Sequence, residues 1–346
     1  MAEGVFDLTD TLSYGLERCC EARWITVHRS PGYANNAVLT RFGERYYCMW
    51  QESEKDEDTP DTGVYLSTST DGESWGEPAM LAGPTEVFFA SPGGWLQRGD
   101  SLVAIINYTT AADRSLGGNA YYVSTVDGKC WSEPRPMLMA DGSPVEGIFE
   151  QDPLLLESGR TVGAVHFRPG AQLCPVYTDD PSGVRGWTRA VFPDGDGKPI
   201  EPSQYLTRDG RLVMFMRDQN SSFVKLVSLS ENDGESWTAP CRSTIPDSRS
   251  KQCAGNLPDG TAFWAGNPTG CKSRRVLAIA FSDDGYVFDR AFLLASVSDL
   301  PPRRHDGRYK TLGYNYPKAT VISDTLWLSL TVNKEDVVLI KLPPNP

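Results

Sequence analysis

The feature that most constrains the fold of this chain is a short turn sequence that recurs along it at nearly constant spacing. Each copy begins with Ser or Thr, continues through Asp-Gly or a close variant and ends on an aromatic residue; the copies are 69–75, 125–131, 230–237 and 282–288, with a degenerate copy at 177–187. The closing aromatics are Trp75, Trp131, Trp187, Trp237 and Phe288, so the steps between them are 56, 56, 50 and 51 residues. A period of about 50 residues, with short alternating strands between the turns, is typical of β-propeller blades.

The residues of this turn sequence indicate a structural role. Asp or Asn followed by Gly favours a tight hairpin turn that needs positive φ, and a preceding Ser or Thr hydroxyl can bond the turn backbone. The closing aromatic can then pack back against its blade. We therefore predict structural rather than catalytic roles for the acidic residues of the four regular copies, Asp71, Asp127, Asp233 and Asp284.

A second, weaker repeat predicts the number of blades. Six segments begin with a polar residue, continue with a small residue or Pro and run into an apolar strand; they start at residues 35, 90, 150, 201, 251 and 314. The alternating segment 319–342 supplies the last strands, and Trp24–His28 can close the ring beside them, which removes exposed sheet edges. The prediction is an all-β, six-bladed β-propeller with four-stranded antiparallel blades, spanning residues 21–346, after an N-terminal arm at residues 1–20.

Composition excludes several classes of function. The formal charge of −12 disfavours nucleic acid as a partner, because binding phosphates needs a basic surface. No run approaches the ~20 apolar residues of a membrane-spanning helix, and the N-terminus lacks the features of a signal peptide, which favours the cytoplasm. The eight cysteines are scattered and there are three histidines, so we expect free thiols and neither a metal centre nor a cofactor.

The predicted propeller places one set of polar residues around its central axis. Innermost strands begin at the rim of the central channel, and the second strands return to the same face, so polar side chains at these points should converge. Acids, bases, amides and tyrosines around one axis provide many polar groups and a few aromatic faces, which suits a carbohydrate ligand. The predicted lining is Asn35, Asn36, Gln51, Asn107, Glu150, Asp152, His166, Arg168, Glu201, Arg217, Lys251, Tyr314 and Tyr316.

The recurring turn resembles the Asp-box of the sialidase superfamily, and the segment from Glu201 to Arg217 resembles a second part of that family. There, a Glu at an inner-strand start activates a nucleophilic Tyr, and an Arg on the following strand binds the substrate carboxylate. The resemblance implies that Tyr316 is the nucleophile, with Tyr314 as the competitor. A tyrosine hydroxyl, with a pKa of about 10, needs a nearby carboxylate to take its proton, and tyrosine nucleophiles are known among glycosidases.

The same resemblance implies two further site residues. Arg275 or Arg274, ahead of the strand at 277–282, is similar in position to another carboxylate-binding Arg of the family. An acid/base Asp is expected in the first blade before its turn sequence, where Asp58 is the candidate and Asp56 and Asp61 are the alternatives.

One segment departs from the family pattern. Sialidases begin their first blade with Arg-Ile-Pro, whose Arg completes a three-arginine clamp, whereas this chain has Ala-Asn-Asn-Ala at 34–37. Asn cannot replace the charge of a bidentate Arg. The resemblance thus points to a substrate other than ordinary sialic acid.

Three functions remain open on the sequence. The first is an exo-acting glycoside hydrolase for a glycan with an acidic terminal or penultimate sugar, using Tyr316, Glu201 and Asp58. The second is a uronate-directed lyase or hydrolase in which His166 or Tyr316 is the acid/base and Arg168, Arg217 or Lys251 neutralises the carboxylate. The third is a glycan-binding propeller without catalysis. The sequence sets no oligomeric state.

Overall fold

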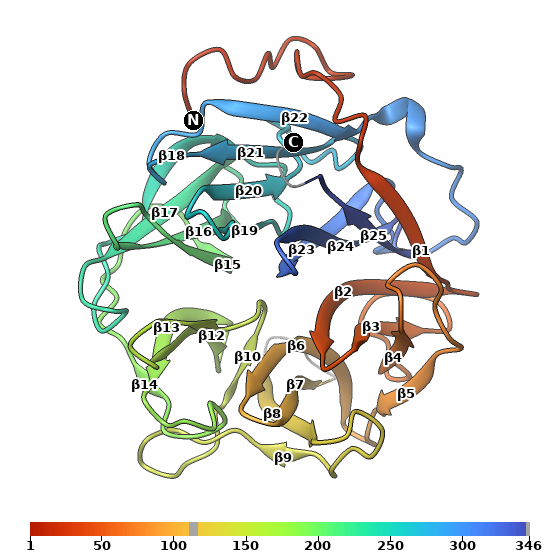
Figure 1. Ribbon diagram of the computed structural model, residues 1–346, viewed down its shortest axis with the longest axis vertical. Helices are drawn as coiled ribbons and strands as arrows, with labels where there is room; N and C mark the ends of the chain where they lie inside the picture. The colour runs from red at the N-terminus through yellow and green to blue at the C-terminus, as the bar shows by residue number, and fades with distance from the viewer. Residues whose placement is uncertain (111–116, 344–346) are drawn as a thin grey trace.

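The computed structural model describes residues 1–110 and 117–343, and these form a six-bladed β-propeller (Figure 1). Each blade is an antiparallel sheet, and the six sheets surround a central axis. The fold class and the number of blades predicted from the two repeats are therefore confirmed. Within the described residues, no helix is long and apolar enough to cross a membrane.

The first three blades are consecutive along the chain. Blade 1 consists of β2 (Tyr33–Phe42), β3 (Arg45–Ser53), β4 (Gly63–Ser69) and β5 (Ala79–Ala82). Blade 2 consists of β6 (Phe88–Arg98), β7 (Ser101–Thr110), β8 (Gly118–Thr125) and β9 (Arg135–Pro136). Blade 3 has its inner strand in two pieces, β10 (Gly147–Phe149) and β11 (Leu154–Leu155), which both pair with β12 (Thr161–Phe167), followed by β13 (Gln172–Thr178) and β14 (Thr188–Arg189).

The last three blades complete the ring. Blade 4 consists of β15 (Pro199–Leu206), β16 (Leu212–Asp218), β17 (Val224–Ser230) and β18 (Cys241–Pro246). Blade 5 consists of β19 (Cys253–Asn256), β20 (Ala262–Gly266), β21 (Leu277–Ser282) and β22 (Arg290–Ala295), followed by a single 3₁₀ turn, η2 (Val297–Asp299). Blade 6 consists of β23 (Tyr314–Ile322), β24 (Thr325–Val332) and β25 (Asp336–Lys341), with β1 (Arg23–Arg29) as its outer strand.

Pairing of β1 with β25 closes the ring, as the sequence predicts. Arg23 pairs with Lys341 and Arg29 pairs with Asp336, so the first and last strands of the chain share one sheet. This arrangement gives the last blade four strands, with the first strand of the chain at its outer edge. The assignment of residues 1–20 as an arm and 21–346 as one domain stays a prediction.

The recurring turns are held by short-range hydrogen bonds. In the first copy, the Asp71 carboxylate accepts bonds from the backbone N–H groups of Glu73 and Ser74, each at 2.8 Å, and from the Ser69 hydroxyl at 2.9 Å. In the third copy, Asn232 rather than Asp233 accepts the equivalent bonds from Ser230 and Ser236. Asp233 instead occupies a left-handed backbone position, with φ of 52°.

Irregularities in the inner strands re-aim side chains at the central channel. Strands β2, β15 and β23 each carry a shift in register against their neighbour, and each shift contains a residue with positive φ. These residues are Asn36 (58°), Glu201 (50°) and Tyr316 (56°). Left-handed backbone at residues other than Gly costs free energy and gathers at functional sites, and bulges change the direction of a side chain. The polar starts of these strands are therefore where function is expected.

Replacing Gly94 with Ala is expected to destabilise the propeller. A Cβ at this position would lie 2.7 Å from Oδ1 of Asp152 and 2.9 Å from its Cα, at a φ that L-residues rarely adopt. The combined overpacking and strain should lower the free energy of unfolding by about 2–4 kcal/mol in a urea titration. Gly270 is the matched control, because a Cβ there meets open space. Equal urea midpoints for the two variants would contradict the prediction.

Candidate active site

A cavity of about 270 Å³ lies where the polar starts of the inner strands meet. Blades 1 to 6 all contribute to its wall through inner strands or the loops beside them. Its charged and polar lining includes Asn36, Gln51, Glu57, Asp58, Glu150, His166, Glu201, Lys251 and Tyr316. The structure thus brings together eight residues that the sequence predicts for the pocket, and it adds Glu57.

Tyr316 lies among cations and carboxylates. The centre of its ring is 4.9 Å from Nζ of Lys251, 5.2 Å from the guanidinium carbon of Arg274 and 5.5 Å from Nζ of Lys334. Burial raises its pKa well above the ordinary value, and the charges of Glu201 and Glu57 add to this effect. The phenol is therefore protonated at neutral pH, and it needs a base during any reaction in which its oxygen attacks.

Glu201 is held by an ion pair inside the pocket. Arg217 donates from one guanidinium nitrogen to Oε2 of Glu201 at 2.8 Å and from another to Oε1 of Gln219, also at 2.8 Å. Burial works against the charged carboxylate, but Arg217 and Lys251 outweigh it and lower the pKa of Glu201 to about 2. Glu201 is therefore an ionised carboxylate at every physiological pH.

His166 and Glu150 belong to a hydrogen-bonded network that crosses the channel. Nε2 of His166 accepts a bond from the backbone N–H of Glu201 at 3.0 Å, and Nδ1 lies 3.7 Å from Oε1 of Glu150. Lys251 forms an ion pair with Oε2 of Glu150 and donates to Oδ1 of Asn36 at 3.1 Å. Asn36 therefore faces a cation that a neighbouring carboxylate already neutralises.

Glu57 is the pocket residue that the sequence analysis missed. Its carboxylate pairs with Lys334 at 2.6 Å and accepts bonds from the Tyr33 hydroxyl at 3.1 Å and from Asn35 at 3.3 Å. Burial opposes its ionisation, but Lys334 and Arg274 outweigh this and keep its pKa below the ordinary value. The acidic run at 55–61 was the available signal, although it could not say which carboxylates turn inward.

The other acids of that run point in different directions. Asp58 lines the pocket, and its Oδ1 lies 3.5 Å from Nε2 of Gln51. Asp56 accepts bonds from the backbone N–H groups of Arg308 and Tyr309, and Asp61 accepts one from Glu54. Among the three aspartates considered for the acid/base role, Asp58 is therefore the one that lines the cavity.

Seven predicted residues do not line this cavity: Asn35, Asn107, Asp152, Arg168, Arg217, Arg275 and Tyr314. Tyr314 is buried in the blade, where its hydroxyl donates to the carbonyl of Ser296 at 3.1 Å. Arg275 is exposed beside a separate cleft with Leu300 and Arg303, whereas its neighbour Arg274 lies over Tyr316. Arg168 is exposed and donates to Asn119 at 3.1 Å, and Asn35 is fully buried and contacts Glu57 and Thr331. Asn107 is also buried, and its amide donates to the carbonyl of Phe149 at 2.6 Å.

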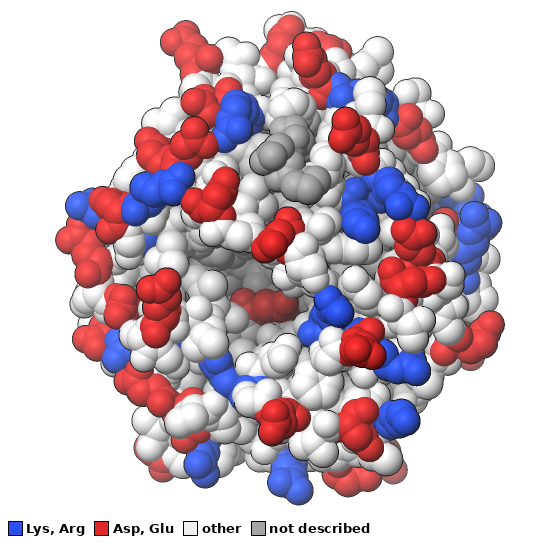
Figure 2. All heavy atoms as spheres, in the orientation of Figure 1, with Lys and Arg blue, Asp and Glu red and all other residues white. Residues whose placement is uncertain are grey.

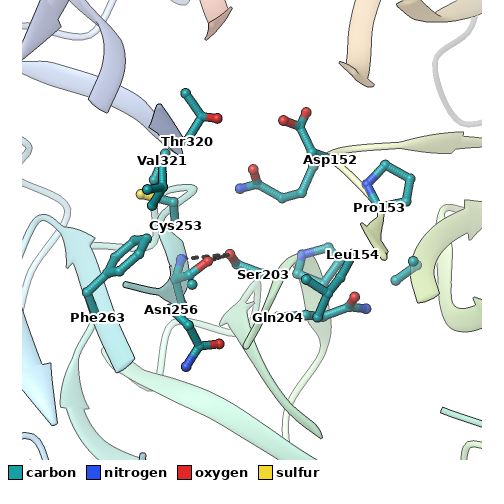
Figure 3. A pocket seen from close by; sticks show the side chains of 17 residues that line it. Asp152, Pro153, Leu154, Ser203, Gln204, Cys253, Asn256, Phe263, Thr320 and Val321 are labelled. Carbon is teal, nitrogen blue, oxygen red and sulfur yellow. Dashed lines mark hydrogen bonds between the residues drawn. The ribbon is translucent and has the colours of Figure 1, made fainter. Parts of the chain in front are cut away.

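Asp152 lines a second cavity, of about 300 Å³ (Figure 3). Figure 3 shows Asp152, Ser203, Cys253 and Thr320 grouped around it. Burial raises the pKa of Asp152 to about 6, although Lys318 works against the shift. The prediction that Asp152 shares the sugar pocket with Glu150 therefore differs from the structure: both residues lie in the break between β10 and β11, but Glu150 lines the first cavity and Asp152 lines the second.

Pairing of charges limits which cations are available to a ligand. Arg217, Lys251 and Lys334 are each paired with a carboxylate, Glu201, Glu150 and Glu57 respectively. Arg274 makes a hydrogen bond to the amide of Asn315 at 3.0 Å and no ion pair among the described residues. Figure 2 shows that one face of the propeller is hollowed at its centre, with acidic side chains in and around the hollow.

Acid is expected to remove the stabilisation that the Glu201–Arg217 pair provides. The pKa of Glu201 falls from an ordinary 4.5 to about 2 on folding, so its contribution is complete above about pH 4.5 and is lost as pH falls towards 2. At about 1.4 kcal/mol per pKa unit, the contribution is on the order of 3 kcal/mol. Urea titrations between pH 6 and 2.5 should show a shallower acid loss for Glu201→Gln than for the wild type. Parallel curves would contradict the assignment.

A family model described as a BNR repeat-like domain matches residues 44–328, and the chain therefore belongs to that family. Its solved relatives of similar fold include sialidases. A structure titled "Sialidase" superposes with a TM-score of 0.69 at 18% identity, covering 95% of this chain and 33% of that one. The intramolecular trans-sialidase from Ruminococcus gnavus gives a TM-score of 0.66 at 12% identity, covering 90% of this chain and 94% of that one.

A third solved structure is a protein of unknown function from Dyadobacter fermentans. It gives a TM-score of 0.68 at 15% identity and covers 93% of this chain and 98% of that one. No curated protein matches the chain. This chain spans about a third of the length of the first of these structures, and at such identities the similarity shows the fold alone.

Proposed function

We propose that this protein is an exo-acting glycoside hydrolase for a glycan with an acidic terminal or penultimate sugar. The observation that carries the proposal is the position of Tyr316, whose phenol lies in a buried pocket near two ionised carboxylates and beneath Arg274. A neutral nucleophile suits an anionic sugar, because a carboxylate nucleophile would repel it. The similarity of the fold to sialidases supports the same class of reaction.

In the proposed mechanism, Tyr316 attacks the anomeric carbon while its phenolic proton passes to Glu201. The glycosidic bond breaks, and the leaving oxygen takes a proton from Asp58, which lines the cavity. Water then attacks the anomeric carbon of the tyrosyl-sugar, with Asp58 accepting a proton, and Glu201 returns the proton to the Tyr316 oxygen. The pocket thus supplies one nucleophile, one base for it and one acid/base, and the reaction retains the anomeric configuration.

The substrate carboxylate is assigned to Arg274, with support from Arg217. Arg274 has no carboxylate partner among the described residues, whereas Arg217 is shared with Glu201 and Gln219. Segment 34–37 carries no cation for a three-arginine clamp; the cation that contacts this segment is Lys251, which donates to Asn36 and which Glu150 already neutralises. The site is therefore suited to one anionic group held by fewer charges than such a clamp provides.

A lyase acting beside a uronate is the second candidate, and the contacts of His166 argue against the form that uses this residue. Nε2 of His166 accepts the Glu201 N–H, so that lone pair is not free to take a substrate proton. A lyase would then depend on Tyr316, and a binding propeller would use the same pocket without turnover.

The experiment that separates these functions is incubation with sialosides, uronic-acid oligosaccharides and neutral glycans. Released sugar and near-ultraviolet absorbance are read together. We expect release of an acidic sugar without growth of absorbance. Absorbance growth on uronates would indicate a lyase, because β-elimination leaves an unsaturated product. Saturable binding without any product would replace the enzyme with the glycan-binding propeller.

A further inference from the structure

His166 contacts the backbone of Glu201 rather than the open pocket. It lies on β12 of blade 3, is only 5% exposed, and its Nε2 accepts the N–H of Glu201 in blade 4 at 3.0 Å. A ring nitrogen that accepts a hydrogen bond carries no proton, so the neutral ring has its proton on Nδ1. Nδ1 faces Oε1 of Glu150 at 3.7 Å, which is the side where a carboxylate favours an N–H.

The N–H of Glu201 needs this partner because of the bulge in β15. The register with β16 runs from Ile200 directly to Ser203, so Glu201 lies in the part of the strand that the ladder skips. Its φ of 50° puts it in the left-handed region, and the residue is 7% exposed. A buried N–H without an acceptor is costly, so the imidazole supplies what the irregular strand cannot.

The other side of His166 is also fixed. Glu150 is held by Lys251, and Lys251 is held in turn by Asn36 and lies over the Tyr316 ring. Residues of five blades, blade 1 and blades 3 to 6, therefore take part in the network around this imidazole. The network ends at the hydrogen bond between Nε2 of His166 and the backbone N–H of Glu201.

We propose that His166 is a positioning residue that holds Glu201 in its left-handed conformation and so directs the Glu201 carboxylate towards Tyr316. The effect on turnover depends on the proposed hydrolase function, whereas the hydrogen bond and its tautomer do not. The role requires a neutral ring, because a proton on Nε2 would remove the acceptor. The charged groups that face the ring are Glu150, Glu201, Lys251 and Arg217.

Burial supports this requirement. It lowers the pKa of His166 below the ordinary 6.5; Glu150 and Glu201 act in the opposite direction, and Lys251 and Arg217 add to the lowering. The net direction keeps the ring neutral at pH 7 and above. Acid that protonates the ring should therefore remove the acceptor and loosen the Glu201 backbone.

The first test reads the tautomer directly and needs no activity. Long-range ¹H–¹⁵N NMR on protein labelled with ¹⁵N-histidine separates Nδ1–H, Nε2–H and cationic rings, and His166→Gln identifies the His166 signals among the three histidines. We expect Nδ1–H with an unprotonated Nε2 at pH 7.5. An Nε2–H tautomer or a cationic ring at this pH would overturn the proposal.

The second test compares two substitutions of the same residue. His166→Gln places an amide oxygen near the former Nε2 and keeps an acceptor, whereas His166→Leu removes it. On the substrate found in the panel, we expect kcat to fall about 100-fold in His166→Leu, with KM within about threefold, and at most about fivefold in His166→Gln. His28→Gln, on outer strand β1 beside Glu52, is the control and should match the wild type.

The outcomes separate this role from simple packing and from failure of the proposed function. Equal losses in the Gln and Leu variants, or a loss confined to KM, would overturn positioning. If the wild type turns over no glycan, the hydrolase proposal fails and the tautomer alone decides the positioning contact. If His166→Leu does not fold, the tautomer and the near-wild-type kcat of His166→Gln are the results that support the role.

Discussion

Tyr316→Phe is expected to lower kcat at least about 10³-fold on the substrate identified in the panel, because it removes the attacking oxygen and leaves the ring in place. The ring contacts with Lys251 and Arg274 do not need the hydroxyl, so KM should change by less than about threefold. Steady-state kinetics of the purified variant measure both quantities. The fold should be unaffected, since no hydrogen bond of the blade depends on this hydroxyl among those described.

Tyr314→Phe is the matched control for this prediction. Tyr314 lies two residues earlier on the same strand, but its hydroxyl donates to Ser296 inside the blade. Its loss should cost about 1 kcal/mol of unfolding free energy and leave kcat unchanged. If Tyr314→Phe abolished activity and Tyr316→Phe kept it, the nucleophile assignment would be wrong.

Arg274→Gln is expected to lower kcat/KM about 100-fold on an anionic substrate, mainly through KM. Its guanidinium lies over Tyr316 and has no carboxylate partner within residues 1–110 and 117–343, so its charge is available to the ligand. Loss of a charge-assisted bond of about 2–3 kcal/mol corresponds to such a factor. The effect should be much smaller on a substrate whose carboxylate is methylated, because no charge remains to be neutralised.

Arg275→Gln provides the comparison. Arg275 is the next residue in the chain, carries the same charge and is exposed beside a different cleft. Its replacement should change kcat/KM by less than about twofold. Equal losses in the two variants would show that general charge, rather than contact at the pocket, accounts for binding, and would remove Arg274 from the site.

The fold could be predicted from the sequence because the recurring turn is held by local hydrogen bonds and its copies are regularly spaced. The bonds that Asp71 accepts come from residues two or three positions away, so local sequence specifies them completely. The alternation of segment 319–342 predicted the last strands, and Trp24–His28 was the segment offered to close the ring beside them. These are short-range or periodic features, and they can be recognised in a sequence without knowing which residues pack against them in the fold.

The direction of individual side chains could not be predicted from the sequence. Tyr314 and Tyr316 would face the same side of a regular strand, and a bulge with Tyr316 at φ of 56° sends one into the blade and the other to the pocket. Likewise, the choice between Arg274 and Arg275 depends on a bridge from Arg274 to Gly313 in the next blade. A shift of one residue reverses which side chain faces a site, and sequence patterns do not resolve such shifts.

The sequence by itself determined the class of fold, the number of blades and how the ring closes. The tertiary structure decided that Glu57 joins the pocket, that Asp152 lines a second cavity and that His166 serves the backbone of Glu201. The physical reason is the range of the interactions. Turns and strand alternation depend on neighbours in the chain, whereas buried ion pairs and bulge contacts depend on residues that other blades bring into place.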